Sequence, residues 1–399
     1  MDQGRRNVVA LSACQALLVM NNVMMISIGT LAADALAGNK LLVTLPATAY
    51  IVGAGVATLP MSHFMKRRGR RAGFLLGCLF GVSGALLAAA AIWLHEFWLL
   101  CAATAVSGVY NGTGGFYRFA AADAASVDFK SKAISLVLAG GIVGGVLGPE
   151  SSKLTRELLG PLFLGSFLSL VALAGTAMLI LRQLHMPTPS EEERSGEQRP
   201  IVSIMRQPAF IVAALGGIAA YGVMNLLMAA APLAMQFCGH AYGAQVLVIE
   251  WHIVAMFAPA FVTGWLISRF GALPIMFAGV LLKLAAIWVA VSGIAVLNFW
   301  LSMVLIGVGW CFLFVGGTTL LTEVYSPAEK AKTQGLNDLL IYLTMSTSSL
   351  MSGAILYRFG WNLLNYSALP LLAITGLAVL WLAQTRRSAA ARALMASAK

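Results

Sequence analysis

Two short stretches of the sequence combine residue types that could bind a soft metal ion. Met224 and Met228 lie four residues apart in YGVMNLLMAAAPLAM, and His252 and Met256 have the same spacing in IEWHIVAMF. Residues four apart share one face of a helix. Thioethers are soft, neutral ligands, and together with an imidazole they suit Cu(I) better than Mg²⁺, Ca²⁺ or Mn²⁺. The pattern therefore predicts a copper site.

A second interpretation of the same residues is packing. The chain has 18 methionines among 399 residues, and methionine is a flexible filler of irregular cores. A histidine inside a membrane helix can be satisfied by a carbonyl or a hydroxyl, although an ionisable group at that depth is by default a functional candidate. The residue types alone leave both interpretations open.

The composition is that of an integral membrane protein, because 59% of the residues are hydrophobic and only 10% are charged. Apolar runs of about 18 residues or more predict membrane-spanning helices. We predict twelve spans, at residues 8–31, 41–62, 72–94, 98–121, 131–149, 161–182, 208–234, 244–267, 273–293, 297–320, 334–356 and 362–384. The first follows Arg5 and Arg6 and is longer than an ordinary signal peptide core, so we expect an uncleaved anchor.

The positions of the basic residues predict the orientation of these spans. Most of the 26 Lys and Arg residues fall on the side of the N-terminus, which places both termini in the cytoplasm. The net charge of +11 is thus a signal of topology and gives no reason to expect nucleic acid. The five cysteines form no CxxC pair and imply no disulfide framework.

The polar stretch HMPTPSEEERSGEQRP separates six spans from six. We therefore divide the chain into bundles at 1–182 and 208–399, joined by a cytoplasmic linker at 183–207. The halves echo each other, since the pattern V-M-N-x-x-M occurs at 19–24 and again at 223–228. Parallel six-helix repeats place the substrate near the midplane between them. The copy in the first half makes Met20 and Met24 candidates for a weaker part of the same metal pathway, or for inherited packing.

Depth in the membrane supports the metal site. If span 208–234 runs outward and span 244–267 runs inward, a rise of about 1.5 Å per residue brings Met224 level with Met256, and Met228 level with His252. These four side chains could then converge in one layer of the membrane.

The paired motifs resemble those of the CcoA-type copper importers of the major facilitator superfamily. The loop SHFMKRRGRR also resembles the G-x-x-x-D-R-x-G-R-R loop of that superfamily, with Lys66 in place of its Asp. The resemblance implies an all-α membrane protein of twelve helices in two pseudo-symmetric six-helix bundles. It also implies alternating-access import of copper across a bacterial inner membrane for heme–copper oxidase assembly. The ligands would be Met224, Met228, His252 and Met256, and the partners would be the lipid bilayer and a cytoplasmic copper acceptor. We expect a monomer.

Charged residues close to the ends of spans predict a gate. Arg118 is expected to pair with Asp123 or Asp338 on the cytoplasmic side, because unpaired charge inside a membrane is rare. The alternative is that Arg118 binds an anionic substrate. Lys283, inside the ninth span, is expected to extend its amine toward the membrane surface.

The sequence shows no nucleotide-binding glycine loop and no hydrolytic triad, so we expect neither an enzyme nor a bound cofactor. Two alternatives to copper import stay open. One is a proton-coupled transporter of small organic molecules or drugs, with the Met and His residues as packing. The other is a membrane copper-binding assembly factor that does not transport.

Overall fold

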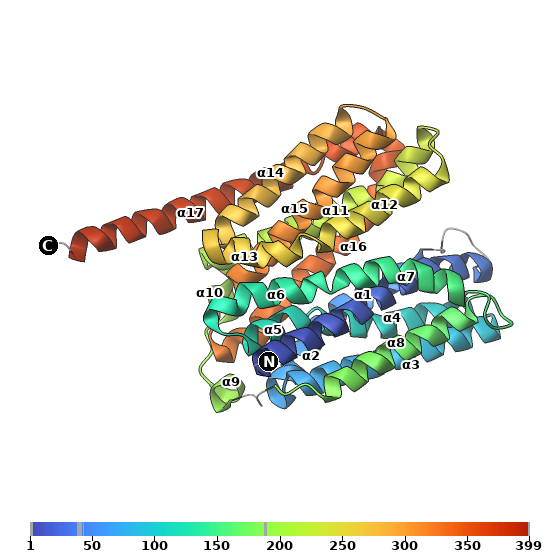
Figure 1. Ribbon diagram of the computed structural model, residues 1–399, viewed down its shortest axis with the longest axis horizontal. Coiled ribbons are helices and arrows are strands. Elements are labelled where there is room, and N and C mark those ends of the chain that lie inside the picture. The colour runs from blue at the N-terminus through green and yellow to red at the C-terminus, as the bar shows by residue number, and fades with distance from the viewer. Residues whose placement is uncertain (1–2, 38–41, 43, 187–189, 398–399) are drawn as a thin grey trace. The chain divides into compact units, whose positions relative to one another are not determined.

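The computed structural model describes residues 3–37, 42, 44–186 and 190–397, and its regular elements there are all helical. The start of the predicted second span at residue 41 and residues 187–189 of the predicted linker lie outside this part. The predicted all-α fold is confirmed. In order, the helices are α1 (Gln3–Leu36), α2 (Leu45–Arg68), α3 (Arg70–Leu94), α4 (Phe97–Gly114), α5 (Tyr117–Ala124), η2 (Val127–Phe129), α6 (Lys130–Ala139), α7 (Gly141–Thr155), α8 (Leu164–Arg182), α9 (Glu191–Ser195), α10 (Ile201–Met205), α11 (Pro208–Phe237), α12 (Tyr242–Phe257), α13 (Ala260–Phe270), α14 (Ala272–Val291), α15 (Val296–Leu321), η3 (Pro327–Glu329), α16 (Lys330–Tyr366) and α17 (Leu369–Ser397) (Figure 1).

Each of the twelve predicted spans overlaps a helix. Within the described residues, ten helical stretches are long and apolar enough to cross a membrane. The difference has two causes. The last two predicted spans fall within one stretch of 63 residues, Pro327–Ala389, and α4 is absent from the ten. The end of α4 reads YNGTG, and these small and polar residues lower its apolar character.

The chain forms two compact units. Unit 1 comprises Met1–Gln198 with Ser326–Thr347, and unit 2 comprises Arg199–Tyr325 with Ser348–Lys399. The first boundary between the units, at Gln198 and Arg199, lies inside the predicted linker 183–207. Ser326–Thr347 belongs to the second half of the sequence but packs in unit 1, so α16 belongs to both units. The compact units divide the chain by contacts, whereas the predicted bundles at 1–182 and 208–399 divide it by sequence repeats. The bundle boundaries therefore stay a prediction.

Glycines set the spacing of the helices in unit 1. A Cβ atom at Gly108 of α4 would collide with the carbonyl oxygen of Tyr50 on α2, and one at Gly112 would collide with that of Ala54. The same is true of Gly144 on α7 and the carbonyl oxygen of Ala16 on α1. Figure 1 shows α1 beside α7, and α3 beside α8. Small residues at such contacts let helix backbones approach closely inside a membrane.

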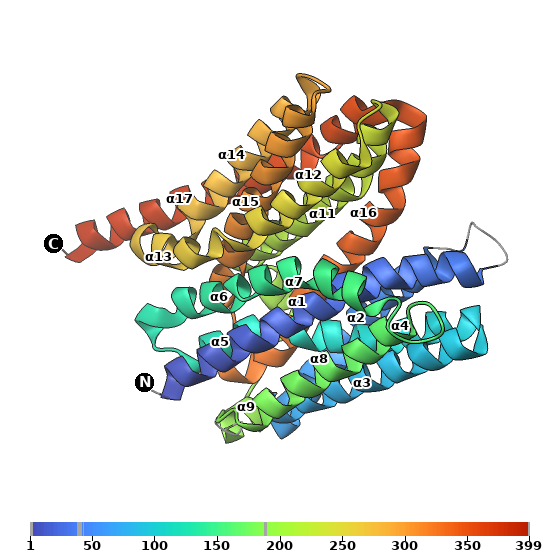
Figure 2. The same ribbon diagram turned by 45° about the vertical axis from the view of Figure 1, so that its right-hand side comes forward.

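Unit 2 is built in the same way around α15. Figure 2 shows α14 and α15 side by side, and their contact runs through Gly279 and Gly309, where a Cβ atom on one would meet the other's carbonyl oxygen. Helix α11 also packs on α15, and α12 packs on it as well. The central position of α15 within unit 2 explains why its side chains are mostly buried.

The middle of α16 is rich in hydroxyl side chains that bond to the helix itself. Thr344, Ser346 and Thr347 donate to the carbonyls of the residues four positions earlier, at 2.8 to 3.0 Å. Such back-bonding slightly destabilises and often bends a helix. It occurs here where α16 passes from unit 1 to unit 2, between Thr347 and Ser348.

Gly108→Ala should destabilise unit 1, because the added methyl group collides with main chain that cannot rotate away. Overpacking of this kind costs about 1–3 kcal/mol. We expect a lower thermal unfolding midpoint for the purified protein in detergent. The matched control is Gly175→Ala on α8, where a Cβ atom meets nothing within 4 Å and the midpoint should hold or rise. Equal midpoints for the two variants would contradict the proposed contact between α2 and α4.

Candidate functional site

His252 lies on α12 and is completely buried. Its Nδ1 is 2.7 Å from the carbonyl oxygen of Met303 on α15. Because a carbonyl only accepts, Nδ1 carries the proton and donates it, which leaves Nε2 as an acceptor. No hydrogen-bond partner for Nε2 is present among the described residues. The imidazole is therefore fixed by α15 and keeps one buried lone pair.

The methionines predicted to accompany His252 are buried or half-buried. Met224 on α11 is 4% exposed and Met256 on α12 is 8% exposed, while Met228 is half-buried. The contacts that hold His252 come from Met303 and Gly307 of α15. Burial is common to the metal interpretation and the packing interpretation, and a metal-binding role for these methionines stays a prediction.

Met20 and Met24 of unit 1 lie in or against an apolar cluster. Met24 is completely buried among Met25, Ile28 and other hydrophobic side chains, and the partly buried Met20 packs against the same cluster. The backbone of Met20 also lies where a Cβ atom at Gly144 would fall. These surroundings favour inherited packing, and a role in metal transport stays a prediction.

Arg118 and Asp338 form a buried ion pair in unit 1. The Nη2 atom of Arg118, on α5, donates to Oδ1 of Asp338, on α16, at 2.5 Å, and the two side chains are 5% and 3% exposed. Asn337 donates to the same oxygen at 3.0 Å, and the guanidinium lies 4.4 Å from the ring centroid of Phe119. Of the two partners that the sequence suggested for Arg118, Asp338 makes this pair.

Asp123 takes part in a neighbouring charge cluster instead. Its Oδ2 accepts hydrogen bonds from Arg70 at 3.1 and 3.2 Å and lies 3.3 Å from Nζ of Lys330. Arg70 also donates to Gln334 at 2.6 Å, and Lys330 donates to Glu193 at 2.8 Å. The loop SHFMKRRGRR lacks its usual Asp, and here a carboxylate from α5 pairs with its arginine.

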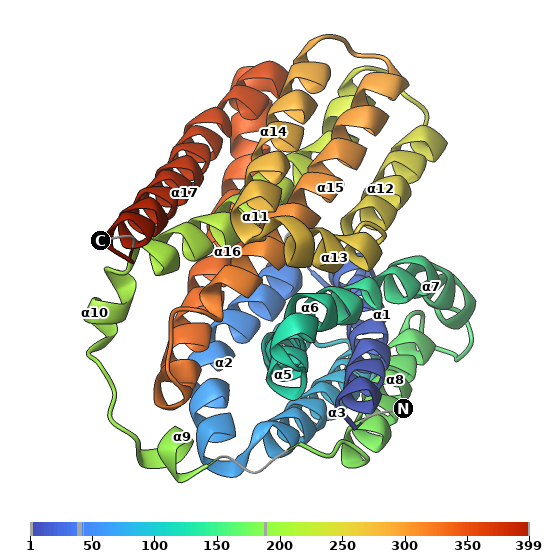
Figure 3. The ribbon, with the colours of Figure 1, turned by 60° about the vertical axis from the view of Figure 1, so that its left-hand side comes forward.

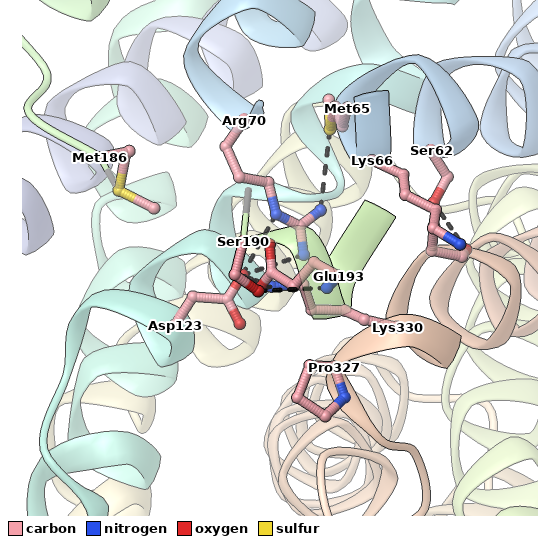
Figure 4. Close-up of a pocket in the computed structure, with 11 residues that line it drawn as sticks. Ser62, Met65, Lys66, Arg70, Asp123, Met186, Ser190, Glu193, Pro327 and Lys330 are labelled. Atoms are coloured by element: carbon pink, nitrogen blue, oxygen red, sulfur yellow. Dashed lines mark hydrogen bonds and ion pairs between the residues drawn. The ribbon is translucent and has the colours of Figure 1, made fainter. Parts of the chain in front are cut away.

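These charges line a pocket of unit 1. The pocket has a volume of about 340 Å³, and its lining includes Lys66 and Ser190 as well as the charged cluster (Figure 4). Helix α9 packs against η3 and α2 beside it (Figure 3). Glu193 brings α9 to this cluster through Lys330. The cluster therefore joins four segments that are far apart in the sequence.

Lys283 does not extend to the membrane surface, and the expectation from the sequence is wrong. It is completely buried on α14, with Nζ donating to the carbonyl oxygens of Ala219 and Ala220 on α11 at 3.2 and 2.8 Å. The absence of a side chain at Gly309 leaves room for its methylene groups. The physical reason is that these main-chain oxygens lie within reach, so the ammonium group is satisfied without leaving the bundle.

A chain of neutral polar side chains crosses three helices of unit 1. The hydroxyl of Tyr50 on α2 donates to Oδ1 of Asn22 on α1. Nδ2 of Asn22 donates in turn to Oδ1 of Asn111 on α4, at 2.8 Å. Tyr50 is 1% exposed, whereas Asn22 and Asn111 are only half-buried. The close contact of α2 with α4 at Gly108 brings these side chains within reach of one another.

Unit 2 contains a group of aromatic rings on α11, α12 and α15. Tyr221 meets Trp310 and Phe314 edge to face, with centroids 5.3 and 5.0 Å apart. Trp310 stacks on Phe314 at 5.1 Å and meets Phe257 at 5.6 Å. Tyr221 is half-buried, while Trp310 is 1% exposed. Of these four rings, that of Tyr221 is the one that is partly exposed.

The sequence interpretation missed the roles of Arg70 and of the two asparagines. Arg70 carried a signal, since it is one of the last two arginines of the loop that resembles a superfamily motif. Asn22 carried one too, because the matching position of the second repeat is Leu226. An asparagine in an apolar span where the repeat has leucine indicates a local requirement for hydrogen bonding.

Comparisons with known proteins agree with this architecture. The family model described as Major Facilitator Superfamily matches residues 10–258 and 213–397. The chain is 38% identical over 373 residues to the riboflavin transporter RfnT of Brucella anthropi, covering 93% of this chain and 94% of that protein. It resembles the crystal structure of the superfamily transporter FucP, with a TM-score of 0.77 and 12% identity over 95% and 99% of the two chains. It also resembles the human organic anion transporter MFSD10, with a TM-score of 0.75 and 13% identity over 95% and 100%. These relatives give no support to the resemblance to copper importers.

Charge reversal in Arg118→Glu should impair transport and lower the thermal unfolding midpoint, because it leaves Asp338 buried beside a like charge. Breaking a buried pair by removing one partner costs about 3–5 kcal/mol. The double variant Arg118→Glu with Asp338→Arg should partly restore both properties. Lys153→Gln, which removes an exposed pair with Glu150, is the control and should change neither. A double variant no better than the single one would argue against direct coupling of these two residues.

Proposed function

This chain belongs to the major facilitator superfamily, and we propose that this membrane transporter carries a small neutral organic molecule of the flavin class. One observation carries the proposal: 38% identity to a riboflavin transporter, extending over 93% of this chain and 94% of that protein. The match at that level of identity extends over almost the whole length of both chains. The proposal replaces copper as the leading cargo.

The polar groups of unit 1 suit a neutral cargo. Asn22, Tyr50 and Asn111 are uncharged hydrogen-bonding groups, and they bond to one another rather than to an ion. The buried charges of Arg118 and Asp338 in the same unit are paired with each other. An anionic or cationic substrate would require an uncompensated charge of opposite sign within the membrane. A flavin ring instead offers neutral carbonyl and N–H groups on a planar aromatic frame.

The aromatic rings of unit 2 suit the planar part of such a molecule. Aromatic pairs stack with an offset or meet edge to face, with centroids about 4.5–7 Å apart. Tyr221 makes edge-to-face contacts with Trp310 and Phe314, and its ring is partly exposed. A ligand site lined mainly by apolar and aromatic groups, with a few polar groups that fix orientation, is the usual design for small molecules.

We place the transporter in a bacterial inner membrane, with both termini in the cytoplasm as the basic residues predict. In this orientation the cluster of Arg70, Asp123 and Lys330 lies on the cytoplasmic side, together with the pair of Arg118 and Asp338. We propose that these charges form an inner gate. Breaking them would require leaving buried charges unpaired, so they hold the segments of unit 1 together until substrate binding supplies compensating free energy.

Expression of this chain should allow a bacterial riboflavin auxotroph without a transporter of its own to grow on low external riboflavin. Purified protein should also bind riboflavin, which can be followed by quenching of the intrinsic flavin fluorescence. The Gly175→Ala variant should behave as wild type, and the empty vector should not support growth. A protein that inserts normally in the membrane but shows neither binding nor growth would refute the proposal.

Copper import is the second candidate, and one observation favours it. Nδ1 of His252 donates to a backbone carbonyl, while Nε2 is buried without a partner in the described part of the chain. In metal-binding histidines, the ring nitrogen that does not bind the metal often donates a hydrogen bond to a backbone carbonyl. The copper ion would be cargo, held by His252 with the thioethers of Met224, Met228 and Met256 and passed to a cytoplasmic acceptor.

Copper accumulation separates the two candidates. We expect cells with and without this chain to accumulate the same amount of copper, since flavin transport requires no metal site. A rise on expression that is lost in both His252→Ala and Met228→Leu, with unchanged amounts of protein, would instead establish copper import. The flavin assay on the same variants then shows whether the same residues serve both cargoes.

A further inference from the structure

We infer that Tyr50, Asn22 and Asn111 form the subsite of unit 1 that recognises the imide edge of the transported ring. This inference rests on the proposed function, because it assumes a flavin-class substrate. An imide presents a carbonyl, an N–H group and a second carbonyl in one plane. A side-chain amide presents an N–H₂ donor and a carbonyl acceptor in one plane, so the two can form a pair of parallel hydrogen bonds.

The direction of the hydrogen bonds determines which group is left for the substrate. Tyr50 donates to Oδ1 of Asn22, which fixes the orientation of the Asn22 amide. Its Nδ2 therefore faces Asn111 and donates to Oδ1 of that residue at 2.8 Å. Each group in this chain donates to the next one. The chain ends at Nδ2 of Asn111, which has no hydrogen-bond partner among the residues that the structure describes.

The side-chain amide of Asn111, at the end of these hydrogen bonds, is a strengthened donor. Hydrogen bonds that run in one direction polarise one another, by roughly 10–30% per bond in condensed phases. The terminal N–H₂ group of Asn111 thus seeks an acceptor such as a carbonyl. Oδ1 of Asn111 accepts one bond from Asn22 and keeps a second lone pair. Asn111 therefore offers a donor and an acceptor side by side, the complement of a carbonyl next to an imide N–H.

Packing fixes Tyr50 at the buried end of this subsite and leaves the two amides partly exposed. Tyr50 is buried, and its backbone lies against Gly108 of α4, so the base of the hydrogen-bond chain cannot shift. Asn22 and Asn111 remain half-buried and can be reached by a ligand. Five residues along α2 from Tyr50, Gly55 leaves room for Tyr342 of the first part of α16, which also belongs to unit 1. Tyr342 is half-buried, and its side chain begins beside Gly55.

The subsite selects a neutral ligand with adjacent donor and acceptor groups. A metal ion would meet amide groups, which are poor ligands for soft metals. A polyol could form the same number of hydrogen bonds, but it has no planar ring that could pack against an aromatic side chain. A site built to bond a substrate N–H discriminates strongly against an analogue that lacks it, because its own polar groups are then left unpaired.

The test compares riboflavin with 3-methylriboflavin, in which a methyl group replaces the imide hydrogen. Each flavin competes with the uptake of labelled riboflavin. The measured quantity is the ratio of the two concentrations that halve this uptake, that of 3-methylriboflavin over that of riboflavin. The wild-type protein should favour riboflavin by about tenfold or more, the value of one lost bond with an unsatisfied partner. Asn111→Leu, similar in size but without hydrogen-bonding atoms, should bring that ratio close to one and weaken riboflavin itself.

Tyr50→Phe tests the positioning role of the hydroxyl. It removes only the oxygen that orients Asn22, so the ratio should fall part of the way while the thermal unfolding midpoint stays close to that of the wild type. Ser27→Ala is the matched control on α1, because the exposed Ser27 only bonds back to its own helix. It should keep the wild-type ratio.

The outcomes separate this inference from the proposed function. If the wild-type protein transports riboflavin but accepts both flavins equally, the imide subsite is refuted and flavin transport stands. The same holds if folded Asn111→Leu and Tyr50→Phe both keep the wild-type ratio. If the wild-type protein neither binds nor transports riboflavin, the proposed function fails, and the subsite fails with it.

Discussion

A polar group inside a lipid bilayer has no water to bond with, and this constraint organises the protein. Each unsatisfied group there costs several kcal/mol, so the polar side chains must find partners within the bundle. Arg118 finds Asp338, Lys283 finds two main-chain carbonyls, and the hydroxyls of α16 bond to their own helix. Partners can be this close only because glycines allow the helices to approach. The terminal donor of Asn111 is the end of such a network, and there we propose that the ligand supplies the next partner.

The helices could be predicted from the sequence because their signal is local. Long apolar runs and the polar linker are visible along the chain, and every predicted span overlaps a helix. Which residues meet across helices is not a local property. The sequence limited the partner of Arg118 to Asp123 or Asp338, but the ion pair that forms between α5 and α16 depends on the folded structure. Lys283 was predicted wrongly because the two carbonyls that hold it lie more than 60 residues away.

The candidate site shows the same limit more clearly. Spacing predicted that Met224 and Met228 share a helix face, but it does not determine what that face contacts. The apolar surroundings of Met24 come from residues of several helices, and His252 is fixed by a carbonyl of α15. Soft chemistry was therefore an insufficient guide to the cargo. The hydrogen-bond chain could not be predicted either, since Asn22 and Asn111 are separated by 89 positions.

Helix α16 connects the two compact units without interruption at their boundary, and this has a mechanical consequence. A rigid rod shared by two bodies would allow neither to move without the other. Its main chain is softened at Thr344, Ser346 and Thr347, whose hydroxyls share the carbonyls that normally accept only from the helix backbone. A bend there can lengthen main-chain hydrogen bonds while the side chains keep those oxygens satisfied. The helix can thus bend within a single turn while its backbone keeps the two units connected.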